Sequence, residues 1–228
     1  MSNSQTDLSQ EKERHQKLKK YENRAYREGF RRIAGLDEVG RGPIAGPVVA
    51  AAVILPRNFF LPGVNDSKLV SPGRRLEMAV EIKRKAMAWA VAAVSSRQID
   101  RQNILQCTRE AMLICVEELT PRPDFLLIDA VSLPNLNIEQ HPIIKGDSLS
   151  ISIACASILA KVERDAVMAS YDQLFPGYGF KHHKGYATRE HCMALESLGP
   201  CAIHRGSFQP VKSMLGIKDW IQPGLFDT

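Results

Sequence analysis

Four acidic residues stand at the ends of short apolar segments. Asp37 and Glu38 close the segment IAGLDE, Asp129 closes FLLID, and Asp147 follows IIKG. Polar residues often end strands only because turns are polar, and Asp147 could act simply as a helix N-cap. Three separate strand ends that each deliver a carboxylate nevertheless favour a functional site, since α/β sheets build their sites at such ends.

Carboxylates gathered in this way indicate a site for hard divalent cations. Mg²⁺ is bound by a few carboxylates and keeps water and substrate phosphate oxygens in its remaining positions. Two such ions, about 3.5–4 Å apart, can hold the attacking and leaving oxygens of an in-line phosphoryl displacement. Four clustered acids without a cation would repel one another, and a bound metal ion would offset that repulsion. The pattern therefore predicts metal-dependent phosphoryl chemistry.

The glycines at positions 40 and 42 directly follow the first two acids and flank Arg41. Without Cβ atoms, Gly40 and Gly42 let the backbone approach a sugar closely, and Arg41 could reach a phosphate; a plain tight turn is the alternative. The glycine spacing superficially resembles a dinucleotide-binding fingerprint. Pro43 and Pro47 interrupt it, however, and a β-prone run follows where a helix would be required.

The elements around these residues predict an α/β fold. We expect strands at 32–37, 47–55, 86–95, 125–129 and 141–144, and helices at 71–85, 99–119, 148–175 and 188–198. A first β-meander followed by interleaved strands and helices favours a sheet with helices on its faces. We expect three parts: a charged, helical, exposed extension over residues 1–30, one domain over residues 31–218, and an irregular tail over residues 219–228. The extension is either a solvated arm or an additional arm that contacts phosphates.

Composition limits the class of protein. The chain has 228 residues, of which 44% are hydrophobic and 24% charged, so we expect one soluble globular domain with a real core. A net charge of +5 suits a polyanionic partner, although many soluble proteins are this basic. The N-terminus lacks an apolar leader, the longest apolar run is too short to span a bilayer, and the five cysteines form no CxxC pair. We therefore expect a cytoplasmic protein with reduced thiols and no membrane partner.

Longer segments resemble the bacterial type 2 ribonucleases H, the ribonuclease HII family. They lie within the stretch from about Arg31 to Val211 and read DEVGRGPIAGPVVAAAV, NDSK, LLIDA, KGDSLSISIACASILAKVERD and YGFKHHKGYAT. The resemblance implies a ribonuclease H-like fold with a five-stranded mixed sheet flanked by helices and a small helical C-terminal part. It also implies a monomeric endonuclease that cuts on the 5′ side of a ribonucleotide, in RNA–DNA hybrids or in duplex DNA, and leaves 3′-hydroxyl and 5′-phosphate ends.

The same resemblance assigns roles to individual positions. Asp37, Glu38, Asp129 and Asp147 would form the catalytic quartet and hold Mg²⁺ or Mn²⁺, two ions in the substrate complex. The glycine–arginine–glycine triplet at 40–42 would read the 2′-hydroxyl, the group that distinguishes RNA from DNA. Further substrate-binding positions would be Asn65, Ser67, Lys68, Lys161, Lys184 and Tyr186, with the tyrosine stacking on the sugar at the RNA–DNA junction. The chain departs from the family at Leu69–Ser71, where Lys-Leu-Ser is common, and at Ala187, where Gly is frequent.

Other positions admit more than one interpretation. On the expected long helix, the spacing of Ser150, Ser157, Lys161 and Arg164 places them on one face, which could follow phosphates or could be ordinary helix polarity. The histidines at 182, 183, 191 and 204 lack the spacing of a zinc site. The tail from Gln222 to Phe226 is similar to the short peptides that dock on the bacterial sliding clamp, but Leu225 and Phe226 could instead fold back onto the core.

Three other functions compete with this one. A binding-only module for hybrids would not need four carboxylates facing a polyanion. An integrase-like transferase or a Holliday-junction nuclease would share the acids but not the 40–42 triplet or Tyr186. A type 3 ribonuclease H would carry a larger N-terminal substrate-reading domain than the roughly 30-residue extension present here.

Overall fold

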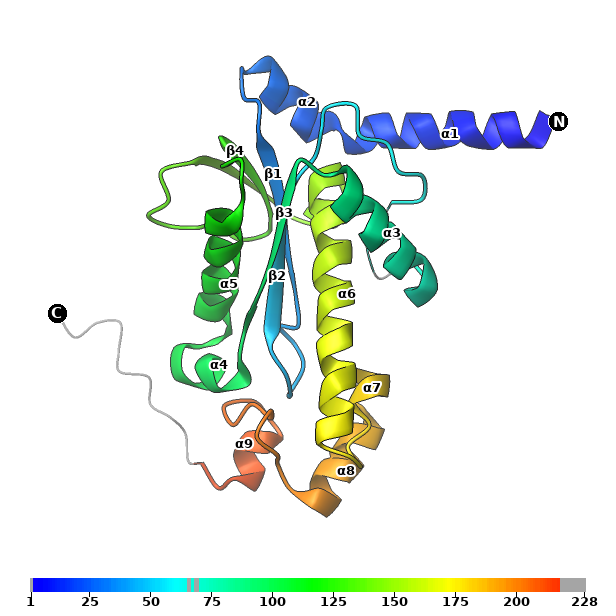
Figure 1. The fold of residues 1–228 in the computed structure, drawn as a ribbon. Helices are drawn as coiled ribbons and strands as arrows, with labels where there is room; N and C mark the ends of the chain where they lie inside the picture. The colour runs from blue at the N-terminus through cyan, green and yellow to red at the C-terminus, as the bar shows by residue number, and fades with distance from the viewer. Residues whose placement is uncertain (1, 65–66, 68–69, 218–228) are drawn as a thin grey trace.

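The computed structural model describes residues 2–64, 67 and 70–217 (Figure 1). Its strands are β1 (Ile33–Val39), β2 (Val48–Ile54), β3 (Ala88–Val94), β4 (Phe125–Asp129) and β5 (Glu139–Ile143). They form one sheet in the order β3-β2-β1-β4-β5, in which the pairs β3–β2 and β2–β1 are antiparallel and the pairs β1–β4 and β4–β5 are parallel. The expected five-stranded mixed sheet is thus confirmed, with each strand within a few residues of its predicted position.

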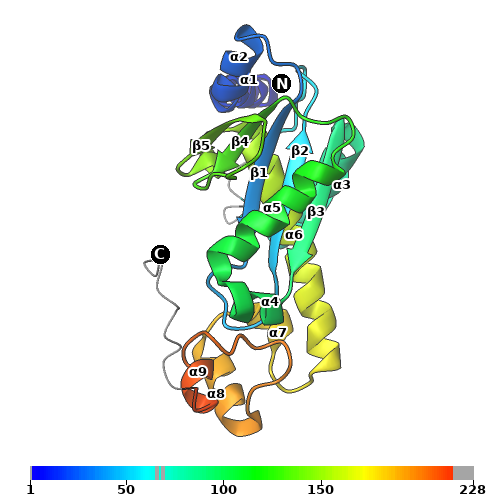
Figure 2. The same ribbon diagram turned by 90° about the vertical axis from the view of Figure 1, so that its left-hand side faces the viewer.

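Helices cover both faces of this sheet (Figures 1 and 2). The helices are α1 (Ser2–Leu18), α2 (Lys20–Arg27), α3 (Pro72–Lys85), α4 (Ser96–Gln102), α5 (Ile104–Glu118), the 3-10 turn η1 (Gly146–Ser148), α6 (Ile151–Leu174), α7 (Phe180–His183), α8 (Arg189–Leu198) and α9 (Val211–Met214). Helix α5 packs on one face and the long helix α6, with α3 beside it, on the other. In the described part of the chain, no helix combines the length and apolar character needed to cross a membrane.

The side chains of β2 show how the two faces are built. Ala50 and Ala52 belong to the core shared with α5, while Val49, Ala51 and Val53 belong to the core shared with α6. Successive side chains of a strand point to opposite faces, so an uninterrupted apolar run is the expected pattern for a strand that is covered on both sides. Every residue of β2 is buried, as that argument requires.

Two helix boundaries differ from the prediction. The helix expected at 99–119 is broken at Asn103, which has a φ of 83° and separates α4 from α5. Its side chain accepts a hydrogen bond from the backbone N–H of Gln106 and so caps the second helix. The helix expected from residue 148 begins instead at Ile151, because residues 146–148 form a separate 3-10 turn that contains Asp147.

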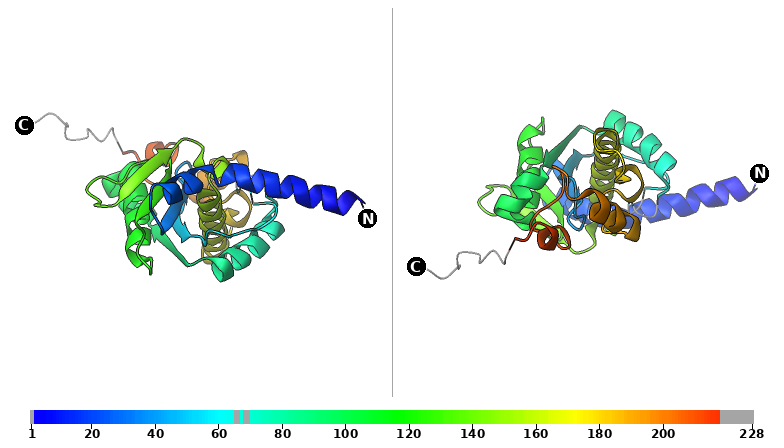
Figure 3. Two further views of the ribbon diagram at one scale, coloured as in Figure 1. Left: turned by 90° about the horizontal axis from the view of Figure 1, so that it is seen from above. Right: turned by 90° about the horizontal axis from the view of Figure 1, so that it is seen from below.

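The N-terminal extension is helical as expected, but it is not fully exposed. Although α1 projects from the body (Figures 1 and 3), its last turn and α2 pack on the domain, where Leu18 and Ala25 are buried. The Glu22 carboxylate is also buried and accepts hydrogen bonds from the hydroxyl of Ser150 at 2.5 Å and the backbone N–H of Ser152 at 3.0 Å. The extension therefore caps the N-terminus of α6, so the expectation of an exposed arm is wrong for α2 and the end of α1.

Candidate functional site

The first three predicted carboxylates meet at one edge of the sheet. Strands β1 and β4 are parallel neighbours, and their register pairs Leu36 with Ile128, so Asp37 and Asp129 are the next residues on each strand. Glu38 follows Asp37 near the end of β1. The pairing of the strands thus brings together acids that are about ninety positions apart in the sequence.

The fourth acid, Asp147, is joined to this edge through the residue before it. The backbone N–H of Gly146 donates a 2.7 Å hydrogen bond to the carboxylate Oδ1 of Asp129. Asp147 itself is buried within η1, the turn that connects β5 to α6. The structure therefore places all four predicted acids along the junction of β1, β4 and α6.

Close contact between β1 and α6 shapes the floor of the site. A Cβ on Gly35 would collide with the backbone of Ser152 and Ile153, so glycine is required for the helix to lie this near the strand. One turn and a half further along α6, Ser157 hydrogen-bonds with the Asp37 carboxylate. The hydroxyl oxygens of Ser157 and Ser67 are 2.9 Å apart, which brings the described residue of the NDSK segment against the same acid.

The electrostatics of the acids follow from their burial. Burial raises the pKa of Asp37 well above its usual range, and the negative charges of Glu38 and Asp129 raise it further, against the opposing hydrogen bond from Ser157. Burial also raises the pKa of Glu38, while the nearby Arg41 guanidinium, 3.4 Å from its Oε1, opposes that rise. The other oxygen of Glu38, Oε2, is buried with no hydrogen-bond partner. The site thus holds more negative charge than its protein surroundings neutralise.

Backbone N–H groups currently occupy some of the oxygens that a cation would use. Asp37 Oδ1 accepts a 2.7 Å bond from the N–H of Glu38, and Asp129 Oδ1 accepts from Gly146. Among the described residues, no group of three or more His, Cys, Asp or Glu side chains is arranged to hold a metal ion. Ligation by the four acids would therefore require their side chains to reorient.

The triplet at residues 40–42 lies next to Tyr186. Gly40 has a φ of +97°, a conformation that disfavours any residue with a Cβ. A Cβ on Gly42 would lie 3.7 Å from Cε1 of the Tyr186 ring, so the second glycine and the tyrosine face one another. The ring is 43% exposed, which leaves it available for contact with a ligand. The backbone N–H of Ile44 donates to the carbonyl of Gly185 at 2.9 Å and holds the two segments together.

The helix-face prediction is corrected by the burial of its members. Arg164 is fully buried and donates to three backbone carbonyls, so it cannot follow phosphates at the surface. Ser150 and Ser157 are buried as well and bond within the protein. Lys161 is partly buried and forms a 2.6 Å ion pair with Asp165. The shared face of α6 is therefore directed mainly into the protein.

Of the remaining predicted positions, the structure describes only Lys184. Lys184 adopts a left-handed conformation (φ 55°) two residues before Tyr186, and its side chain is partly exposed. Asn65 and Lys68 lie outside the described residues, as does the tail from Gln222 to Phe226.

The prediction missed residues that hold the 40–42 triplet in place. Arg205 is buried and donates to the carbonyls of Gly40, Arg41 and Gly46. His191 and His204, which we excluded as zinc ligands, bond to each other beside Tyr186. The sequence gives no specific signal for these contacts, because an arginine or a histidine in an irregular segment does not indicate which partner it binds.

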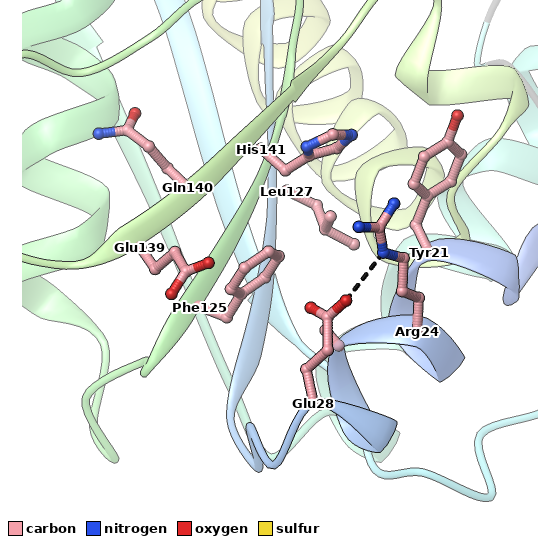
Figure 4. Close-up of a pocket in the computed structure, with 9 residues that line it drawn as sticks. Tyr21, Arg24, Glu28, Phe125, Leu127, Glu139, Gln140 and His141 are labelled. Carbon is pink, nitrogen blue, oxygen red and sulfur yellow. Dashed lines mark hydrogen bonds and ion pairs between the residues drawn. The ribbon is translucent and has the colours of Figure 1, made fainter.

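A separate small hollow lies at the opposite end of β4 from Asp129, between α2 and the outer strands (Figure 4). Its volume is about 80 Å³, and its lining includes Phe125 and His141, with the 2.9 Å ion pair of Arg24 and Glu28 at its side. None of the predicted catalytic or substrate-binding residues contributes to it.

The chain is similar to known proteins of one family. The family model for ribonuclease HII matches residues 34–211. The chain is 62% identical to the ribonuclease HII of Syntrophomonas wolfei over 96% of its own length and 87% of the relative. Its fold is similar to the crystal structure of ribonuclease H2 from Pyrococcus horikoshii, with a TM-score of 0.69 and 22% identity over 81% of this chain and 97% of that one. It is also similar to the ribonuclease HII in a structure of the PCNA:RNase HII complex from Archaeoglobus fulgidus, with a TM-score of 0.63 and 27% identity over 77% of this chain and 94% of that one. With most of its length matched at this level, the chain belongs to the ribonuclease HII family of endoribonucleases.

Proposed function

We propose that this ribonuclease hydrolyses the phosphodiester on the 5′ side of a ribonucleotide, both in RNA–DNA hybrids and at ribonucleotides embedded in duplex DNA. The products would carry 3′-hydroxyl and 5′-phosphate ends. The observation that carries the proposal is the adjacency of an acidic cluster at Asp37, Glu38 and Asp129 to the contact between Gly42 and Tyr186. The acidic cluster can hold cations at a phosphate, and the pair of Gly42 and Tyr186 can contact the sugar beside that phosphate.

The acids are suited to bind Mg²⁺ or Mn²⁺. Asp37 and Glu38 are disfavoured as free carboxylates, as the raised pKa of each shows, and Glu38 Oε2 lacks any partner. A divalent cation would relieve the repulsion and satisfy that oxygen, with Asp129 and Asp147 as the further ligands. When bound, two ions would activate the attacking water and stabilise the leaving 3′-oxygen. In this scheme the hydroxyls of Ser157 and Ser67 orient Asp37 toward the reacting phosphate.

The triplet at 40–42 and Tyr186 would select the ribonucleotide. Backbone groups of Gly40 and Gly42 are free of side-chain bulk and can hydrogen-bond a 2′-hydroxyl, which DNA lacks. Arg41, exposed at the rim, would contact a phosphate once a cation replaces it as the partner of Glu38. The Tyr186 ring would stack on the deoxyribose across the junction. Lys184, with Asn65 and Lys68 outside the described residues, would complete the backbone contacts, and Lys161 would join them on leaving its ion pair with Asp165. Ser67, which is buried against Ser157, would act from behind the acids.

The direct test uses a labelled DNA duplex that carries one embedded ribonucleotide, incubated with Mg²⁺, with Mn²⁺ or with EDTA. We expect a single cut on the 5′ side of the ribonucleotide with either metal and none with EDTA. The matched all-DNA duplex should remain intact, and end-group analysis should find a 3′-hydroxyl and a 5′-phosphate. Cleavage of the all-DNA duplex, or equal cleavage in EDTA, would refute the proposal.

A second proposal concerns a partner. The Archaeoglobus fulgidus relative was solved as a complex with PCNA, and this chain carries a segment, Gln222 to Phe226, in which a glutamine precedes two adjacent apolar residues. We propose that this segment docks on a sliding clamp, where the apolar pair would fill a preformed pocket. Tethering would raise the local concentration of the enzyme on newly made DNA.

Deletion of Gln222–Thr228 tests the clamp proposal against a packing role for the tail. Docking predicts loss of binding to purified clamp with an unchanged melting temperature and unchanged cleavage of a short duplex. A lowered melting temperature, or an intact protein that does not bind the clamp, would contradict it.

A further inference from the structure

A three-residue segment near the C-terminus joins the two elements that are proposed to read the ribose. Ile203, His204 and Arg205 run antiparallel to the chain that follows the 40–42 triplet, with an isolated β-bridge between Ala45 and His204. The N–H of Gly46 donates to the carbonyl of Ile203 at 2.9 Å, and the N–H of Arg205 donates to Ile44 at 2.8 Å. We call residues 203–205 the bridge segment.

Arg205 of the bridge segment hydrogen-bonds the backbone of the 40–42 triplet from the protein interior. Its Nη2 lies 2.6 Å from the carbonyl oxygen of Gly40, its Nη1 lies 2.9 Å from that of Arg41, and its Nε lies 3.0 Å from that of Gly46. The planar fork of a guanidinium sets the directions of all three bonds at once, which a lysine ammonium cannot do. Burial and the nearby Arg164 lower the pKa of Arg205 to about 9, which shows that the buried guanidinium charge is disfavoured. Its three hydrogen bonds to backbone carbonyls offset that cost.

The histidine of the bridge segment reaches the Tyr186 backbone through a second histidine. His204 Nε2 lies 3.1 Å from His191 Nε2, and His191 Nδ1 lies 2.8 Å from the carbonyl oxygen of Tyr186. A carbonyl can only accept, so His191 carries its proton on Nδ1 and accepts on Nε2. His204 must then donate from Nε2, which leaves its Nδ1 to accept the 2.9 Å bond from the N–H of Cys201. Each bond in the chain is satisfied when both rings are neutral.

Arg164 closes the arrangement from the other side. It donates to the carbonyl of Lys184 at 2.9 Å, just before Tyr186, and to the carbonyls of Ala45 and Pro47, just after the triplet. The triplet and Tyr186 are therefore held at both ends, and the separation between Gly42 and the tyrosine ring is set by buried groups rather than by the exposed loops themselves.

We propose that His204 and Arg205 are positioning residues that fix the 40–42 triplet and Tyr186 relative to each other and thereby determine the preference for a single embedded ribonucleotide. The inference rests on the proposed function, because it assumes that these two elements read the sugar on either side of the cut. Binding groups must be held to within a fraction of an ångström to discriminate, and such precision comes from the residues that support them. A uniform RNA–DNA hybrid has no junction for Tyr186 to test, so its cleavage depends less on this separation.

The experiment measures kcat/KM on a duplex with one ribonucleotide and kcat/KM on a uniform hybrid. The readout is the first value divided by the second, called the ratio below. Arg205→Lys keeps the charge but not the fork, and His204→Leu removes the donor to His191. His204→Gln retains an N–H near the position of Nε2. Val211→Ala, in a buried contact of the same region outside the hydrogen-bond chain, serves as the destabilised control. Melting temperatures establish that each variant is folded at the assay temperature.

We expect Arg205→Lys and His204→Leu to lower the ratio by about tenfold, the effect of one lost buried hydrogen bond. His204→Gln should recover most of the ratio, and Val211→Ala should leave it unchanged. In a Tyr186→Ala background the His204 change should have no further effect on the ratio, because it acts through the tyrosine.

The outcomes separate this inference from the proposed function. If Tyr186→Ala lowers the ratio while the His204 and Arg205 variants keep the wild-type ratio, the inference is overturned and the proposed function stands. The inference is also overturned if the His204 and Tyr186 effects add. If Tyr186→Ala itself leaves the ratio unchanged, the ribose-reading role fails and the inference falls with it. Should Arg205→Lys fail to fold, the two His204 variants decide the matter alone.

Discussion

Replacing the most buried acid of the site should stabilise the metal-free enzyme while abolishing its activity. Asp37 is 5% exposed, and its pKa is raised chiefly by burial and then by the charges of Glu38 and Asp129. In the change Asp37→Asn the amide oxygen can still accept from the N–H of Glu38, so the main difference is the loss of the charge. Stability gained by removing a catalytic group is the expected sign of a site held under electrostatic strain.

The size and pH dependence of the effect follow from the direction of the shift. Because the folded-state pKa of Asp37 is raised, the unfolded chain ionises first, and stability is lost as pH rises from the ordinary value near 3.8 through the folded pKa. Asp37→Asn removes this ionisation, so the variant should keep the stability that the wild type loses over that pH range. A domain of this size shifts its melting temperature by about 2–4 °C per kcal/mol, so even about 1 kcal/mol of relieved repulsion should raise the melting temperature of Asp37→Asn measurably at neutral pH. The advantage should shrink as the pH falls toward 4.

The assay is thermal unfolding followed by circular dichroism, in EDTA and then in excess Mg²⁺. Excess Mg²⁺ should raise the melting temperature of the wild type and raise that of Asp37→Asn much less, because a bound ligand stabilises only the state that binds it. Glu81→Gln is the control: this partly exposed carboxylate pairs with Arg84 at 2.8 Å, hydrogen bonds from Arg84 and Lys85 lower its pKa to about 2, and its removal should not stabilise the protein. The reasoning is refuted if Asp37→Asn melts at or below the wild-type temperature in EDTA.

Three further changes test other parts of the molecule. Asp129→Asn should keep the fold but reduce turnover at saturating metal to less than about a tenth, because the amide offers no charge to a cation; higher residual turnover would exclude Asp129 from the quartet. Tyr186→Ala should reduce cleavage at one ribonucleotide more than it reduces duplex affinity measured by anisotropy, since phosphate contacts supply most of the affinity, and equal losses would make the tyrosine a packing residue. Glu22→Ala should lower the free energy of unfolding in urea by about 2–4 kcal/mol by leaving the donors of Ser150 and Ser152 unpaired, and an unchanged midpoint would contradict its role as a cap.

Most of the sheet could be predicted because local patterns coincide with the tertiary environment. The run Val48–Ile54 is apolar throughout and lies in a strand covered on both faces, so its composition and its burial have the same cause. The break at Asn103 could not be predicted in this way. Neither Gly nor Pro marks it, and the residue is held at φ 83° by its position between two packed helices. The local pattern therefore predicts one continuous helix, whereas the folded chain breaks it at Asn103.

The buried acid of the extension shows a second limit of local pattern. The stripe containing Leu18 and Ala25 is narrow, and charged residues surround it, so an exposed helix is the natural expectation. Glu22 is nevertheless buried because its partners, Ser150 and Ser152, begin α6 about 130 residues later. No spacing within the extension indicates those partners.

The same limit explains why the acids of the site could be recognised and the buried arginines could not. A carboxylate at the end of an apolar strand is in an unusual place, and parallel strands bring such ends together. Asp37 and Asp129 can therefore be recognised from the local sequence. An arginine is ambiguous because phosphates and backbone carbonyls both accept from its fork. Arg164 and Arg205 take the second choice: Arg164 donates to carbonyls of two distant segments, at 45–47 and at Lys184, and Arg205 donates to three carbonyls between Gly40 and Gly46. Both guanidinium groups are buried, so neither can contact a phosphate directly, and we expect any effect of these arginines on the substrate to pass through the loops that they hold.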